Sequence, residues 1–115
     1  MNEEKILTDK VFKVTIQGDV WNVYLISEDD IGILEDGDYA ETDFGKKELY
    51  FRTTTMQIVR HELVHVFVYY TYTDTADLTA LQSEELMCEV ISWNWDKVSE
   101  LSAIIFDGLK RLKDE

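Results

Sequence analysis

The chain has 115 residues, a length that fits one domain with one modest hydrophobic core. Apolar residues make up 45% of the chain, which excludes a disordered tail. It carries 24 acidic residues against 11 basic ones, a net charge of −13. This balance argues against direct binding of nucleic acid or of an anionic membrane through a general basic surface.

The cysteine content and the apolar runs also indicate in which cellular compartment the protein is expected. Cys88 is the one cysteine of the sequence, so an internal disulfide framework is excluded and a reducing compartment is favoured. No apolar run approaches the ~20 residues of a membrane span, and the N-terminus has no signal-type stretch. We therefore expect a single cytoplasmic domain over residues 1–115.

The first elements predicted along the chain are two strands. Residues 11–17 alternate between apolar and polar side chains, and residues 20–26 are rich in β-branched and aromatic ones. Gly18-Asp19 lies between them as a turn signal. The sequence therefore predicts a β-hairpin.

The next segment, residues 27–48, contains nine acidic residues against two lysines. Such a run is typical of a solvated surface, and it is also a candidate docking face for a basic partner. We expect a short strand near Tyr39–Asp43 and another over residues 48–52, joined by a hairpin across Gly45-Lys46.

The period then changes to that of helices. Apolar residues at helical spacing predict a helix over about 55–70, followed by a polar loop over 71–82. Ser83 is a candidate N-cap for a second helix over about 84–96, and a third is expected over about 98–113. Strands followed by helices predict an α+β fold, with a small antiparallel or mixed sheet of three to four strands followed by three helices.

The motif that indicates chemistry lies in the first predicted helix. His61 and His65 are four residues apart with Glu62 directly after the first, an H-E-x-x-H pattern. Positions i and i+4 share one helix face, so both imidazoles can reach one zinc ion. Glu62 can face a metal-bound water and deprotonate it. The alternative is two histidines on an ordinary helix.

Tetrahedral zinc needs a third protein ligand, and no histidine remains. The candidates are Glu84 and Glu85, which open the next predicted helix, and Cys88, which follows one turn later. If Glu85 binds the metal, Glu89 lies on the same face and can accept the free N–H of a ligand histidine. Without the histidine motif, the same glutamates would be a solvated helix face.

His61–His65 followed by Glu85-x-x-x-Glu89 resembles the gluzincin clan of zinc metallopeptidases, and is similar to small phage or mobile-element peptidases of the ImmA/IrrE type. The resemblance covers roughly residues 39–97. It implies a minimal zincin with Zn²⁺ as cofactor and Glu85 as third ligand. Glu89 would then support the first histidine.

The resemblance also implies that an edge strand upstream of the metal helix pairs with an extended peptide substrate. Leu49–Arg52 or Tyr39–Asp43 would take that place. A donor for the oxyanion of the reaction is also needed. The candidates are Tyr69, Tyr70, Tyr72, Arg60 and Arg52.

Two functions compete. The first is a zinc metallopeptidase in which His61, His65 and Glu85 hold the metal and Glu62 is the general base, acting on a protein or peptide. The second is a non-catalytic acidic interaction or inhibitor protein that binds a basic partner and has a structural or vestigial metal site. A peptidase whose acidic face selects a basic substrate would combine them.

Overall fold

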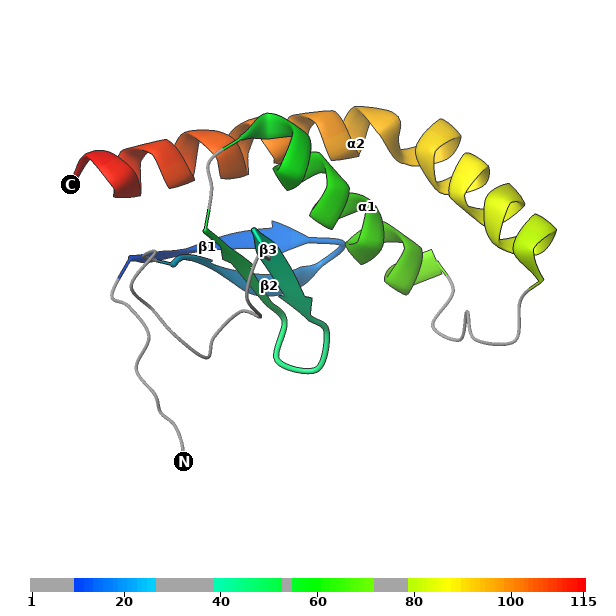
Figure 1. Ribbon diagram of the computed structural model, residues 1–115, viewed down its shortest axis with the longest axis horizontal. Helices are drawn as coiled ribbons and strands as arrows, with labels where there is room; N and C mark the ends of the chain where they lie inside the picture. The colour runs from blue at the N-terminus through cyan, green and yellow to red at the C-terminus, as the bar shows by residue number, and fades with distance from the viewer. Residues whose placement is uncertain (1–9, 27–38, 53–54, 72–78) are drawn as a thin grey trace.

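The computed structural model describes residues 10–26, 39–52, 55–71 and 79–115. These residues form four strands and two helices, and both helices lie on one side of the sheet (Figure 1). In chain order the elements are β1 (Val11–Ile16), β2 (Asp19–Leu25), β3 (Ala40–Asp43), β4 (Glu48–Phe51), α1 (Met56–Thr71) and α2 (Ala80–Asp114). The α+β class and a mixed sheet of four strands are therefore confirmed.

The strand order is β1-β2-β4-β3. β1 pairs with β2 and β3 pairs with β4 in antiparallel fashion, as the two predicted hairpins require, while β2 and β4 are parallel. The first turn lies at Gln17-Gly18, one residue earlier than predicted. Both residues have positive φ, at 50° and 87°, which is the backbone of a two-residue hairpin turn.

The core lies between the sheet and the helices. Alternate residues of β2 and β4, including Trp21, Val23, Leu49 and Phe51, are buried on the side facing the helices. The helices contribute apolar residues at helical spacing to the same cluster: Val59, Leu63, Val66 and Phe67 from α1, and Val90, Val98, Ile105 and Leu109 from α2.

The prediction of three helices is wrong, because residues 80–114 form one continuous helix. The predicted break near residue 97 is absent. Residues 80–107 contain no proline or glycine. Two polar side chains near the expected break bond within the helix: Ser92 Oγ donates to the Cys88 carbonyl at 2.7 Å, and Asn94 Nδ2 donates to the Val90 carbonyl at 3.1 Å.

The start of α2 is also earlier than predicted. Thr79 is the N-cap, in place of Ser83. Thr79 Oγ1 accepts a hydrogen bond from the Gln82 amide at 3.1 Å, and Gln82 Oε1 accepts one from the Thr79 amide at 2.9 Å. This reciprocal capping box satisfies two backbone donors that would otherwise lack partners.

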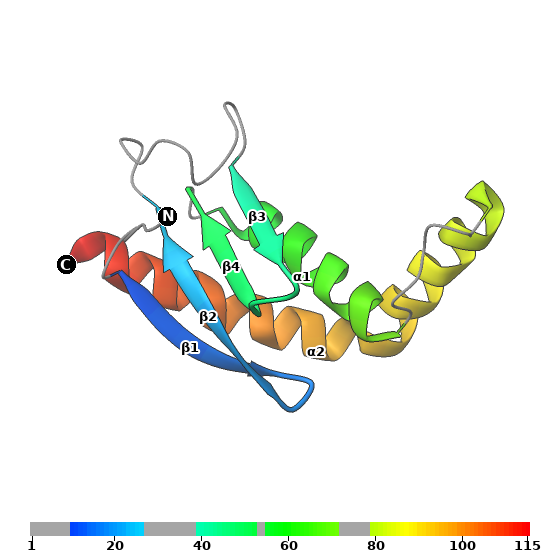
Figure 2. The ribbon, with the colours of Figure 1, turned by 90° about the horizontal axis from the view of Figure 1, so that it is seen from below.

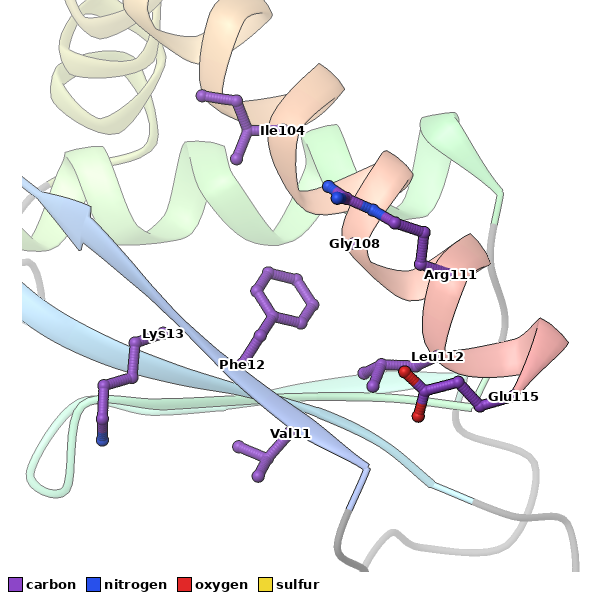
Figure 3. A pocket seen from close by; sticks show the side chains of 8 residues that line it. All are labelled: Val11, Phe12, Lys13, Ile104, Gly108, Arg111, Leu112 and Glu115. Atoms are coloured by element: carbon purple, nitrogen blue, oxygen red, sulfur yellow. The ribbon is translucent and has the colours of Figure 1, made fainter.

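The C-terminal half of α2 packs on β1 at the sheet edge farther from α1. The ring of Phe12 lies directly over Gly108, where no side chain intervenes (Figure 3). Beside it is a shallow hollow of about 390 Å³, lined by residues of β1 and the last turns of α2. No residue of α1 lines this hollow, so it is separate from the histidine motif.

Candidate metal centre

α1 carries the histidine motif on a regular helix, close to the predicted bounds. The ligand atoms of His61, Glu62 and His65 all lie within 4.8 Å of one another. The His61 and His65 rings are exposed, and their Nε2 atoms are 3.2 Å apart. The predicted convergence of these three side chains is confirmed.

The distance between the two nitrogens can be compared with zinc geometry. Two nitrogens about 2.05 Å from one tetrahedral zinc ion are separated by about 3.3 Å. The observed 3.2 Å fits that separation, and it is also the length of an N–H···N hydrogen bond between two neutral imidazoles. The spacing is therefore compatible with a bound metal ion.

Glu62 differs from its two neighbours in being buried, at 9% exposure. Its Oε1 accepts a hydrogen bond from Thr42 Oγ1 at 2.7 Å. Thr42 lies opposite the buried Leu49 in the β3–β4 ladder, so its side chain points to the helix side of the sheet. The second carboxylate oxygen leaves Glu62 able to accept from another donor.

Thr42 is not among the site residues predicted from the sequence. A threonine within an acidic segment carries no signal of its own. Its position follows from the register of β3 on β4 and from the packing of β3 against α1.

The sheet topology decides between the two candidate edge strands. β3 lies at the edge of the sheet and contacts α1, whereas β4 is paired on both sides, with β2 and β3. Within the described part of the chain, the predicted strand Tyr39–Asp43 thus forms an outer strand of the sheet beside the histidine helix. The alternative, Leu49–Arg52, forms most of the interior strand.

The predicted third ligand does not join the group in this structure. Glu85 and Glu89 are both exposed on the first turns of α2, and neither belongs to the cluster of His61, Glu62 and His65. The alternatives Glu84 and Cys88 are exposed on the same turns. Among the described residues, the close group therefore comes from α1 alone.

The candidate oxyanion donors are placed differently from one another. Tyr70 is engaged away from the motif, because its hydroxyl donates to Asp19 Oδ2 at 2.5 Å and accepts from Trp21 Nε1 at 2.9 Å. Burial is the main cause that raises the pKa of Tyr70, and the hydrogen bond to Asp19 raises this pKa further. The other candidates are Tyr69, stacked on Phe44 at 4.6 Å, Arg60, exposed on α1, Arg52, half-buried after β4, and Tyr72, outside the described residues.

No protein-family model, curated protein or solved structure matches this chain. In the part of the chain that the structure describes, neither helix combines the length and the apolar character that crossing a membrane requires. The functional interpretation therefore rests on the residues of the site.

Proposed function

We propose that residues 1–115 form one zincin-like domain that hydrolyses peptide bonds with a bound zinc ion. The observation that carries this proposal is the convergence of His61 and His65 Nε2 atoms at 3.2 Å, beside the buried carboxylate of Glu62. This donor set matches the nitrogen ligands that zinc prefers.

Each residue of the motif has a distinct part in the proposed reaction. His61 and His65 would hold the metal, and zinc when bound supplies an acidified water and polarises the substrate carbonyl. Glu62 would act as the general base that accepts the proton of the attacking water and delivers it to the leaving amine. Thr42 holds one oxygen of Glu62 and so orients the carboxylate.

The position of β3 at the end of the strand order supports an extended peptide as the substrate. A peptide that adds a strand to β3 would lie beside the helix that carries the motif, since β3 contacts α1. Backbone hydrogen bonds would bind such a peptide with little demand on its sequence.

Glu85 stays a prediction as the third ligand, with Glu89 behind it. Because both are exposed on α2 here, their participation requires the first turns of α2 to approach the histidines. A Glu85→Gln variant with lowered zinc affinity would support that role, whereas unchanged affinity would exclude it.

The first test is zinc content by elemental analysis of the protein supplied with zinc. We expect about one ion per chain in the wild type and loss of that ion in His65→Ala, because one histidine of a helix cannot hold zinc alone. Gln57→Ala, an exposed change on the same helix, is the matched control and should keep the metal. A wild type without zinc would contradict the proposal.

The second test separates an enzyme from a metal-binding interaction protein. Cleavage of a library of internally quenched peptides should fall by about 10²–10⁴-fold in Glu62→Gln while zinc is retained. Zinc binding without cleavage in the wild type would instead favour the alternative, an acidic interaction or inhibitor protein whose metal is structural.

A further inference from the structure

The first half of α2 exposes apolar side chains along one line. Leu81, Ile91 and Trp95 are 66%, 41% and 45% exposed, and Cys88 is exposed between them. At about 100° per residue, these four positions fall within about 80° of the helix circumference. We call these four residues the apolar stripe.

The stripe lies on a part of α2 with little cover. Figure 2 shows that the first turns of α2, in yellow, extend past the end of α1 and beyond the sheet. Among the described residues, the stripe is therefore an exposed apolar helix face of the kind that binds a second helix.

The charge around the stripe is of one sign. No lysine, arginine or histidine occurs between His65 and Lys97. Helical spacing places the exposed Glu84 within the sector of the stripe itself. Glu85, Glu89 and Asp96 lie along one border of the stripe, while its other border meets the buried face of α2. A partner seated on the stripe would thus meet an acidic edge.

We propose that the apolar stripe docks a basic amphipathic helix of another protein. Leucine-like side chains of the partner would cover Leu81, Ile91 and Trp95, and its lysines or arginines would face the acidic border. A second copy of this chain is disfavoured because each copy carries a net charge of −13, and pairing would bring two acidic borders together. Neither the proposed docking nor its test needs a bound metal or peptidase activity.

The probe is a synthetic peptide of about 18 residues with leucines on one helical face and lysines on the other. We expect Trp95→Ser to weaken its binding about tenfold or more, since buried tryptophans dominate such interfaces. Affinity should also fall several-fold between about 50 and about 300 mM NaCl.

Trp93 provides a matched control. It is 84% exposed and two residues from Trp95, which places it about 200° away around the helix. Trp93→Ser should therefore change the affinity less than about twofold, and a peptide with glutamates in place of lysines should not bind. Far-UV circular dichroism verifies that both variants keep their helices.

Three outcomes would overturn the proposal: no binding of the lysine peptide, equal effects of the two tryptophan variants, or equal binding of a scrambled lysine peptide that has no amphipathic face. Sedimentation of the free protein is a further check. A dimer that Trp95→Ser abolishes would assign the stripe to a second copy instead.

Discussion

At the scale of single residues, the hydrogen bond between Thr42 and Glu62 connects the edge strand to the histidine helix. This hydrogen bond is 2.7 Å long. It provides a donor for the carboxylate of Glu62, a residue that is 9% exposed. A buried carboxylate without such a donor is costly, so this bond both orients Glu62 and holds β3 against α1.

We predict that Thr42→Val lowers the free energy of unfolding by about 1–3 kcal/mol, because Glu62 Oε1 loses its donor. Thr42→Ser keeps the hydroxyl and should cost clearly less. Urea denaturation of both variants measures the difference. Equal losses would show that the methyl group of Thr42 matters and that the hydrogen bond does not.

At the scale of elements, α2 and β1 approach each other most closely at Gly108. A Cβ atom there would lie 2.5 Å from Phe12 Cζ, closer than any ordinary contact, so the ring would have to move. The close approach of the helix to the strand therefore depends on the missing side chain.

We predict that Gly108→Ala destabilises the protein by about 1–3 kcal/mol, although alanine is the better helix former. Gly45→Ala is the control, since its nearest neighbour would be 3.6 Å away. Thermal or urea unfolding measures both. Recovery of stability in Gly108→Ala combined with Phe12→Leu would confirm the steric cause, and a stabilising Gly108→Ala would refute it.

The pairing of β2 with β4 brings two tyrosines to one carboxylate. Tyr24 and Tyr50 stack with ring centroids 5.3 Å apart, and both hydroxyls donate to Glu48. Burial raises the pKa of each tyrosine, and the hydrogen bond and negative charge of Glu48 raise it further. In the folded state both tyrosines therefore hold their protons more strongly than in the unfolded chain.

The consequence is a loss of stability in alkali. Tyrosines of the unfolded chain ionise at about pH 10, whereas Tyr24 and Tyr50 of the folded protein stay protonated there. Above that pH the unfolded state therefore binds fewer protons than the folded state. The stabilisation is complete below about pH 10 and decreases as the pH rises toward the folded pKa values. Urea denaturation at about pH 8 and about pH 10.5 should show a smaller alkaline loss in Tyr50→Phe than in the wild type. Equal losses would contradict this prediction.

At the scale of the whole molecule, the net charge of −13 acts on folding as well as on partners. Repulsion among like charges opposes the compact state, and salt screens it. We predict that raising NaCl from about 20 to about 200 mM raises the thermal unfolding midpoint. Choline chloride, whose cation is bulky, should act similarly if screening is the cause; an effect confined to one salt would indicate specific ion binding.

The sequence by itself determined the two hairpins, the helix of residues 56–71 and the convergence of His61, Glu62 and His65. Those features are local, because the period of a strand or helix and the i, i+4 spacing are set within one element. Composition also determined the acidic character of the chain.

Only the tertiary structure decided that β3 rather than β4 is an edge strand, that Thr42 meets Glu62, and that α2 runs without a break. Strand order and register depend on contacts between residues far apart in the chain, which local patterns do not encode. The break expected near Asn94–Ser99 is absent, and the side chains of Ser92 and Asn94 bond to helix carbonyls one turn earlier. The position of Glu85 relative to the histidines likewise depends on how α2 packs against α1, and in this structure Glu85 lies outside the histidine group.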